Sequence, residues 1–190
     1  PATVSPRCRC VLSNARTLAA PNKEAQATFA LGCFWGKEYL FQQVPGVRST
    51  RVGYTGGHTE APSYLEVCSK RSGHAEAVEI RYDPECISYA ELLRIFFANH
   101  NPTSRERQGA DHEGNYRSAI FTHGPEQAVA ARALIKKLRA AGYDIVTQVA
   151  ARGPFYAAEA RHQAYCQRTG NLPRPRTYPI DFTHEKLSNH

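Results

Sequence analysis

Between residues 25 and 170 the sequence alternates short strand-like runs with amphipathic helical ones, and this alternation constrains the fold more than any other feature. Strands are predicted at 28–31, 47–54, 75–82, 116–122 and 145–149, and helices at 37–44, 88–99, 125–141 and 157–168. Strands connected through helices are typical of a mixed sheet with helices packed on it. We therefore expect one α/β domain over residues 25–170, with a flexible basic tail at 1–24 and an irregular Pro-containing tail at 171–190.

Two segments carry the clearest local signals. Ser88 and Glu91 have the spacing of a capping box at the start of the helix predicted at 88–99. In the strand predicted at 75–82, Glu76, Val78 and Ile80 fall on one face of the strand. These patterns fix the direction in which each side chain points, provided that the segments fold as predicted.

The positive charge of the chain does not indicate a nucleic-acid binder. The formal net charge is +7, but residues 1–23 hold four basic and no acidic side chains, and residues 168–190 hold four basic and two acidic ones. A nucleic-acid-binding domain carries its basic patch on the folded body rather than on its tails. The sequence also has no apolar run long enough to cross a bilayer. We expect neither a nucleic acid nor a membrane as partner.

Cys33 lies in the pentapeptide Gly32-Cys33-Phe34-Trp35-Gly36, at the predicted corner between a strand and a helix. The unpaired N–H groups and positive end of that helix favour a thiolate, the nucleophilic form of cysteine. The flanking glycines indicate a sharp turn that another group can approach closely. The bulky apolar pair Phe34 and Trp35 favours a small apolar substrate group. The alternative for Cys33 is an inert buried thiol.

Glu76 is unusual because its strand position places a carboxyl group on the apolar face. Desolvation there is expected to raise its pKa, so that the protonated form persists nearer neutral pH and can act as a general acid. The alternative is an exposed carboxylate at a frayed strand end. Tyr64 and Tyr116 flank loop boundaries and can each donate one hydrogen bond, whereas Asp111 lies in a long polar loop where Asp commonly forms turns.

Six motifs in order carry a family resemblance. They are GCFWG, VGYTGG, SYLEVC, GHAEAVEI, FFANHNPT and RQGADHEGNYRSAIF. Over about residues 27–166 the sequence resembles the A type of the peptide methionine sulfoxide reductase family. The resemblance implies thiol-dependent reduction of methionine S-sulfoxide, free or in proteins, and so the repair of oxidised proteins. It also implies an α+β, two-layer sandwich with a mixed sheet and a ferredoxin-like core.

The resemblance assigns roles to the residues singled out above. Cys33 matches the nucleophile, which becomes a sulfenic acid, and Glu76 matches the acid that protonates the sulfoxide oxygen. Tyr64 and Tyr116 match the phenols that hydrogen-bond this oxygen, and Asp111 matches an acidic residue of the same polar wall. Phe34 and Trp35 match the apolar pocket for the substrate S-methyl group.

The recycling of the enzyme is where this sequence departs from the family. Many members carry resolving cysteines in a Gly-rich C-terminal tail, and residues 171–190 contain none. Cys166 is the first candidate for a resolving thiol, with a buried helical cysteine as the alternative. Otherwise an external thiol such as thioredoxin, glutaredoxin or glutathione is expected as reductant, with no cofactor and no metal. We expect a monomer in the cytoplasm, with a mitochondrion or plastid as the alternative suggested by the basic N-terminus.

Two other functional classes are compatible with single features of the sequence. Cys33 with His58 or His74 fits a Cys-His hydrolase or acyltransferase. The pair Cys8 and Cys10 fits a redox or metal-binding tail. Neither class explains the apolar pair that follows Cys33, so the reductase is the leading interpretation.

Overall fold

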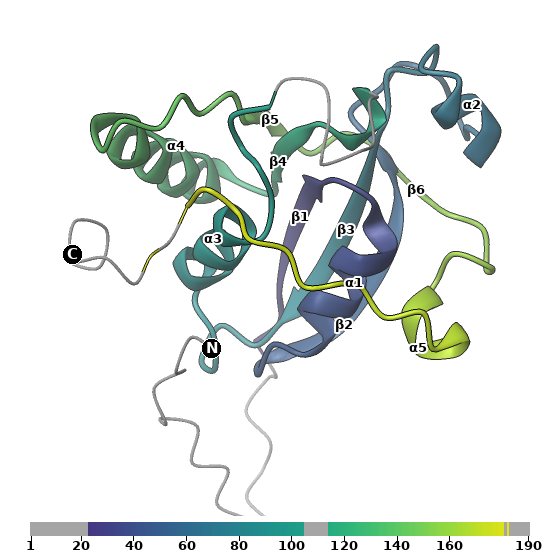
Figure 1. Cartoon of the computed structure of the whole chain (residues 1–190), viewed down its shortest axis with the longest axis horizontal. Helices are drawn as coiled ribbons and strands as arrows, with labels where there is room; N and C mark the ends of the chain where they lie inside the picture. Colours follow the sequence, from purple (N-terminus) through teal and green to yellow (C-terminus); the bar gives the residue numbers. More distant parts are fainter. Residues whose placement is uncertain (1–22, 105–113, 181, 183–190) are drawn as a thin grey trace, which may run out of the picture.

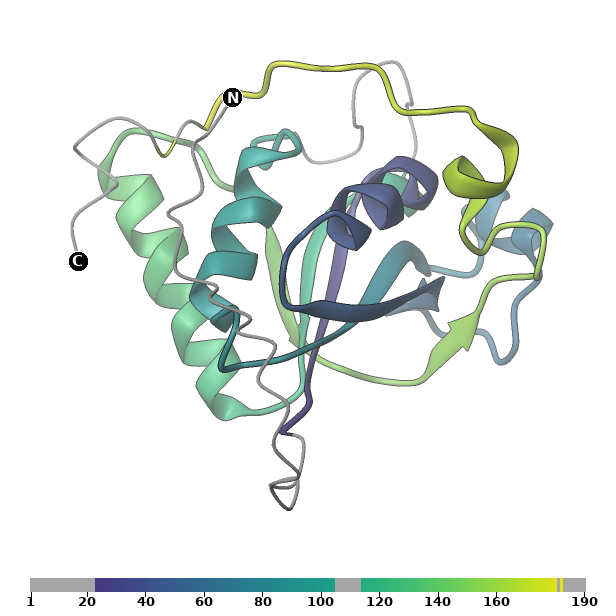
Figure 2. The same cartoon turned by 90° about the horizontal axis from the view of Figure 1, so that it is seen from below.

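The computed structural model describes residues 23–104, 114–180 and 182, which form one twisted sheet with helices packed against it (Figures 1 and 2). The strands are β1 (Ala25–Leu31), β2 (Val47–Thr55), β3 (Ala75–Tyr82), β4 (Ser118–Thr122), β5 (Gln148–Ala151) and β6 (Phe155–Ala157). The α-helices are α1 (Phe34–Gln42), α2 (Tyr64–Cys68), α3 (Tyr89–Ala98), α4 (Pro125–Ala140) and α5 (Tyr165–Thr169), and a 3₁₀ turn, η1, spans Gly114–Tyr116.

The strands follow the order β5-β4-β1-β3-β2-β6 across the sheet. Every neighbouring pair is antiparallel except β4 and β5, which run parallel. The mixed sheet expected from the sequence is therefore confirmed. Helices α1, α3 and α4 lie together on one side of it (Figure 2).

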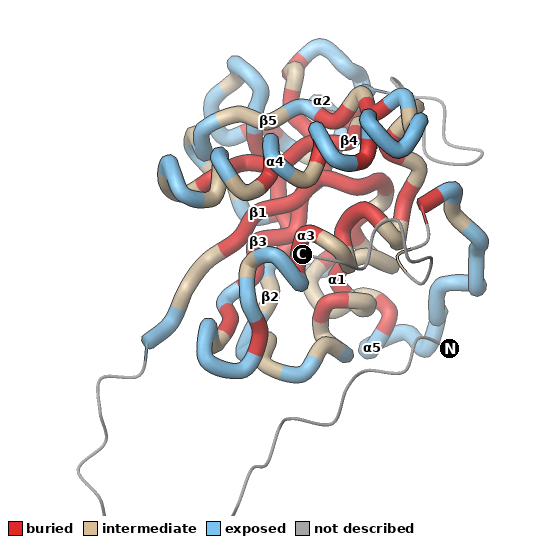
Figure 3. Tube along the Cα trace, turned by 90° about the vertical axis from the view of Figure 1, so that its left-hand side faces the viewer, coloured by how far each residue is buried: buried red, intermediate tan, exposed pale blue. Residues whose placement is uncertain are grey.

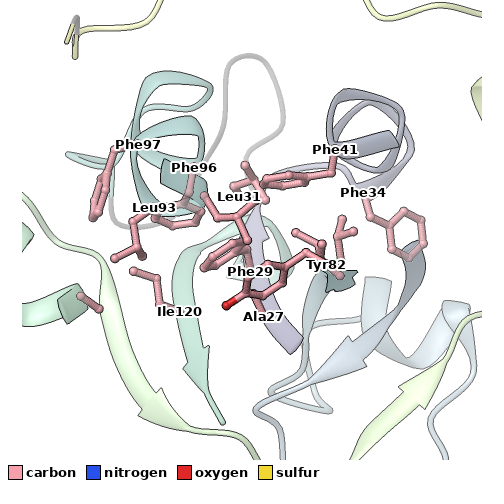
Figure 4. Close-up of a cluster of buried hydrophobic side chains, with 14 of the residues drawn as sticks. Ala27, Phe29, Leu31, Phe34, Phe41, Tyr82, Leu93, Phe96, Phe97 and Ile120 are labelled. Atoms are coloured by element: carbon pink, nitrogen blue, oxygen red, sulfur yellow. The ribbon is translucent and has the colours of Figure 1, made fainter. Parts of the chain in front are cut away.

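The alternation of side chains along the strands places the main core under these helices. Ala27, Phe29 and Leu31 of β1 point to the helical side and are at most 1% exposed. Phe29 packs against Phe96 of α3 with ring centroids 5.1 Å apart, and against Phe41 of α1 at 5.8 Å (Figure 4). The central strand β1 thus ties both helices to the sheet, and Figure 3 shows buried chain concentrated in β1, β3 and β4.

A second, smaller core lies on the opposite side of the sheet and is built mainly from alanines, with one large ring. Its buried members are Ala30, Ala75, Ala77, Ala119 and Phe121. Strands that are buried on both faces carry few exposed positions, which explains why β1, β3 and β4 read as nearly continuous buried runs.

The helix signals in the sequence act locally as predicted. The Ser88 hydroxyl caps α3 by accepting a hydrogen bond from the Glu91 N–H, and the Glu91 carboxylate accepts one from the Ser88 N–H, which completes the capping box. Helix α4 begins with Pro125 at its first turn. Just beyond its end Gly142 adopts φ +96°, a conformation that favours glycine.

The last predicted helix, at 157–168, is wrong in its first half. Residues 155–157 form the edge strand β6 on β2, and α5 begins only at Tyr165. The Gln163 side chain accepts from the Val52 N–H and donates to the Val52 carbonyl. The Gln163 side chain therefore hydrogen-bonds the edge of β2 next to the residues that pair with β6, as the backbone of a neighbouring strand would. Helical periodicity in the sequence does not reveal this interaction. No helix was predicted between residues 54 and 75, where the structure contains the short helix α2.

Two further boundaries differ from expectation. Tyr116 belongs to η1 rather than to the strand that follows, and the strand predicted at 145–149 is found three residues later, as β5. Within the described part of the chain, no single helix is both long enough and apolar enough to cross a membrane.

Candidate active site

Cys33 lies at the corner between β1 and α1, as its sequence context predicted. Gly32 turns the chain with φ +98°, a conformation in which a β-carbon would be strained. Cys33 follows as the N-cap residue of α1, with φ −54° and ψ 118°, and is partly exposed. The thiol therefore adjoins the positive end of the helix, a position that favours the ionised form of a cysteine.

The carboxyl group of Glu76 lies beside this helix start. Its Oε2 accepts a hydrogen bond of 3.0 Å from the backbone N–H of Phe34, the residue that follows Cys33. Glu76 is 1% exposed and shares its strand face with buried Val78 and Ile80. The predicted burial is thus confirmed, and the exposed strand end is excluded. One carboxyl oxygen can accept this bond while the other carries a proton, as a general acid requires.

Tyr64 begins α2, whose capping box is formed by Ser63 and Glu66. Burial raises the pKa of the Tyr64 phenol, and a hydrogen bond with Cys68 and the charges of Glu76 and Cys33 raise it further. The phenol is therefore protonated at neutral pH and keeps a hydrogen that it can donate.

The remaining polar residues predicted for the site differ in how far they can be placed. Tyr116 is half-buried in η1, which packs against β3, the strand that carries Glu76. Asp111 lies outside the described residues. The structure thus brings Cys33, Glu76 and Tyr64 together and leaves Tyr116 on an adjoining element.

The two aromatic residues after Cys33 have different environments. Phe34 is 1% exposed and belongs to the hydrophobic core (Figure 4), whereas Trp35 is only partly buried. The Trp35 indole stacks on Tyr165 of α5 with centroids 3.9 Å apart. Its Nε1–H donates to Nδ1 of His162 at 3.1 Å. The indole is therefore held on two sides and presents a fixed apolar surface beside the thiol.

Sequence reasoning missed three residues of this site. Glu159 accepts a hydrogen bond of 2.9 Å from the Tyr54 hydroxyl and one of 3.0 Å from the Tyr64 N–H. His162 is buried, with its ring 4.6 Å from that of Tyr64. Glu159, His162 and Tyr165 recur at three-residue spacing. This spacing was attributed to the helix wrongly predicted at 157–168, so it was not recognised as a signal of the site.

His162 must be unprotonated at Nδ1, because the indole N–H that it faces is a donor only. Burial lowers its pKa, although the Glu159 charge opposes this shift. The neutral imidazole is therefore the form that keeps Trp35 in position.

Lys37, one helical turn beyond Cys33, supplies a positive charge to the site. Its Nζ donates to the Asn99 carbonyl and, at 3.2 Å, to the Tyr178 hydroxyl. Burial and the nearby Arg176 charge lower the Lys37 pKa to about 8, whereas the charge of Cys33 raises it. This last contribution is the smallest of the three, and it acts when Cys33 is ionised.

Cys166 lies in the first turn of α5, next to Tyr165. Its Sγ donates to the Trp35 carbonyl at 3.3 Å, and the side chain is buried. Burial, followed by the charge of Glu38, raises the pKa of this thiol. It lines the same pocket as Cys33, but it is held as the less nucleophilic, protonated form.

The geometry does not favour a Cys-His hydrolase. His74 accepts from the Gly57 N–H at Nδ1 and contacts the Thr59 carbonyl through Nε2 at 2.8 Å, so both ring nitrogens hold a loop. His58 is exposed. Cys8 and Cys10 lie outside the described residues, and the described ones contain no group of three or more His, Cys, Asp or Glu side chains that could hold a metal ion.

Comparison with known proteins gives a consistent result. The sequence profile described as "Peptide methionine sulfoxide reductase" matches residues 25–189. The peptide methionine sulfoxide reductase MsrA of Klebsiella pneumoniae (strain 342) is 53% identical over 145 residues, which are 73% of this chain and 69% of that protein.

Solved structures agree. The chain resembles methionine sulfoxide reductase A of Corynebacterium diphtheriae, with a TM-score of 0.72 and 37% identity over 82% of this chain and 79% of that one. It also resembles reduced Mxr1 from Saccharomyces cerevisiae, with a TM-score of 0.74 and 30% identity over 82% and 91% of the two chains. Mxr1 has also been solved in complex with Trx2, in a structure that matches with a TM-score of 0.53 and 25% identity over 79% and 90%.

Proposed function

The chain belongs to the peptide methionine sulfoxide reductase family, and we propose that it reduces methionine S-sulfoxide, free or in proteins, with Cys33 as nucleophile. The observation that carries the assignment of residues is the 3.0 Å hydrogen bond from the Phe34 N–H to the Glu76 carboxyl. This hydrogen bond holds the buried carboxyl group at the backbone of Phe34, the residue that directly follows Cys33. A nucleophile and a proton donor are therefore available to one substrate.

The chemistry needs these two groups at the same time. The Cys33 thiolate attacks the sulfoxide sulfur, and the proton of Glu76 passes to the sulfoxide oxygen, which is a poor leaving group until it is protonated. The S–O bond of the substrate breaks and the oxygen ends on Cys33 as a sulfenic acid. The substrate sulfur gains two electrons, the cysteine sulfur loses two, and Glu76 is left as a carboxylate.

The surrounding side chains orient the substrate. The Tyr64 phenol, protonated at neutral pH, donates a hydrogen bond to the oxygen, and Tyr116 adds a second from η1. The fixed indole of Trp35 packs against the S-methyl group, with Phe34 beneath it in the core. Asp111 remains a proposed member of the polar wall on the strength of its motif.

An external thiol reduces the sulfenic acid. Residues 171–190 contain no cysteine, and the Cys166 thiol is buried, protonated and hydrogen-bonded to a carbonyl. These features support a thioredoxin-like or low-molecular-weight reductant over internal resolution by Cys166. The complex of the related Mxr1 with Trx2 supports thioredoxin as one such partner.

The broader features of the protein are proposals of the same kind. We assign catalysis to the domain formed by residues 25–170. We also propose that the protein is a monomer, that it acts in the cytoplasm and that it requires no cofactor. We assign a ferredoxin-like core to β1–α1–β2–β3–α3–β4, supported by the strand order β4-β1-β3-β2. Size-exclusion chromatography with light scattering tests the monomer.

Single-turnover chemistry tests the proposed activity. Reduced protein, given an excess of methionine S-sulfoxide and no reductant, is expected to release one equivalent of methionine. Cys33→Ser abolishes this release, whereas Cys86→Ser, which changes an exposed thiol, leaves it intact. Full release by Cys33→Ser would end the assignment. Counting thiols after one turnover distinguishes the recycling routes: loss of one thiol leaves the sulfenic acid, and loss of two identifies an internal resolving cysteine.

A further inference from the structure

A pocket of about 610 Å³ opens beside Cys33, and its described lining includes Cys33 and Trp35 but none of the proton and hydrogen-bond donors assigned above, Glu76, Tyr64 and Tyr116. One wall is α1, from Cys33 to Leu40. The other is the crossing segment (residues 171–178), which leaves α5 and runs over the outer side of the helical layer (Figures 1 and 2). Gly36 allows this approach, because a β-carbon there would lie 3.1 Å from Cβ of Pro173.

The pocket is lined by positive charge. Lys37, Arg174 and Arg176 all border it, and its described lining contains no Asp or Glu. None of the three forms an ion pair with a carboxylate in the described part of the chain. Three cations at one small concavity repel each other, and a bound anion relieves that repulsion.

The electrostatics link these cations to the reactive sulfur. The charge of Arg176 lowers the pKa of Lys37, and the charge of Cys33 raises it. Lys37 therefore interacts electrostatically with both the arginine side of the pocket and the reactive cysteine. Once Cys33 has been oxidised to an uncharged sulfenic acid, the thiolate no longer compensates the cations. The pocket is therefore most attractive to an anion at the stage of the cycle that awaits reduction.

We propose that this basic pocket binds a low-molecular-weight thiol that carries carboxylate groups and presents its sulfur to oxidised Cys33. This inference rests on the proposed function, because it assigns the site of the second half-reaction. Pockets of 300–1,000 Å³ are typical for small-molecule ligands, and the volume here fits a thiol of di- or tripeptide size. Trp35, Tyr165 and the Tyr178 ring supply apolar surface for its stem.

The reaction in the pocket is balanced by two molecules of the thiol. The first attacks the Cys33 sulfenic acid, forming a mixed disulfide and releasing the oxygen as water. A second thiolate attacks the mixed disulfide, restores the Cys33 thiolate and leaves with the first thiol as a disulfide. The thiols lose two electrons in total, and Cys33 regains the two that it gave to the sulfoxide.

A charge series of small thiols tests the pocket directly. The sulfenic acid is first formed with methionine sulfoxide, and the excess substrate is removed. Its reaction is then timed with mercaptosuccinate, 3-mercaptopropionate, 2-mercaptoethanol and cysteamine, which differ chiefly in charge. The wild-type protein is compared with Arg174→Glu/Arg176→Glu, in which two exposed side chains of the crossing segment change sign. Each thiol is compared with itself in two proteins, so its intrinsic nucleophilicity cancels.

The variant is expected to react about tenfold more slowly with 3-mercaptopropionate and more slowly still with mercaptosuccinate. With 2-mercaptoethanol the rate of the variant should equal that of the wild type, and with cysteamine it should be higher. Added salt should weaken these differences. Arg174→Gln/Arg176→Gln should give a smaller effect in the same direction.

The matched control is Arg132→Glu/Lys136→Glu, which makes the same change in net charge on exposed positions of α4, at the far end of the helical layer (Figure 2). An equal loss in this control, or an equal loss for all four thiols, would overturn the proposal. So would a variant that slows methionine release from acidic peptides but not the thiol step, which would assign the pocket to substrate. If no protein forms the sulfenic acid at all, the proposed function has failed instead.

Discussion

Replacing Glu76 by Gln tests the central arrangement of the site with little change of shape. The Gln side chain keeps an oxygen that can accept from the Phe34 N–H, so the 3.0 Å contact at the helix start can persist. We expect the free energy of unfolding to change by only about 1 kcal/mol. The proton that the sulfoxide oxygen needs is lost, because an amide is not an acid.

The loss of activity should be far larger than the loss of stability. General acid catalysis contributes about 10²- to 10⁴-fold, which corresponds to roughly 3–5 kcal/mol of the barrier. The assay is the rate of methionine release in a single turnover, followed by rapid quench over a range of pH. We expect the limb of the wild-type profile that reports the acid to be absent from Glu76→Gln.

A second buried carboxyl group on the same strand provides the control. Glu79 lies three residues further along β3 on the opposite face, is 4% exposed and pairs with Arg51 and Arg152. Glu79→Gln should lower stability more than Glu76→Gln, because two ion pairs lose their shared partner, yet leave the single-turnover rate close to that of the wild type. A folded Glu76→Gln protein with a rate within tenfold of the wild type would refute our assignment of the acid.

Three further predictions follow from other contacts. Tyr64→Phe removes one hydrogen-bond donor near Cys33, so methionine release should slow by about 10- to 100-fold, less than in the Glu76 variant; an undiminished rate would exclude the phenol from the site. Gly36→Ala crowds Pro173 at 3.1 Å, so hydrogen exchange in the crossing segment should quicken, whereas Gly153→Ala, which meets nothing within 4 Å, should not affect it. Burial lowers the His100 pKa to about 3, so the unfolded chain binds the extra proton below pH 6.5 and stability falls as the pH drops from 6.5 towards 3. Urea titrations should register this as a loss of about 2–3 kcal/mol between pH 7 and 4.5 that His100→Gln lacks, and parallel curves for the two proteins would contradict it.

The elements that the sequence predicted well are those whose signals are local. Strand β3 has the predicted bounds, and α3 begins with the predicted cap, because side-chain alternation and capping act within a few residues. The helix after residue 156 was predicted wrongly because β6 is held by β2, a distant strand, and by the side chain of Gln163.

The reactive corner of the protein follows from local features of the sequence. A glycine, a cysteine and a helix start adjoin in the chain, and strand parity alone turns Glu76 to the apolar side. The family motifs added the identity of the chemistry.

The side chains that surround this corner are brought there by long-range contacts of the folded chain. Trp35 and His162 are 127 positions apart, and Tyr54 and Glu159 are 105 apart, yet each pair shares a hydrogen bond. The basic pocket likewise exists only because the crossing segment returns over α1. Such contacts depend on the path of the chain through space, which is set by the packing of the whole sheet and its helices, and no periodicity within a short window of sequence encodes them.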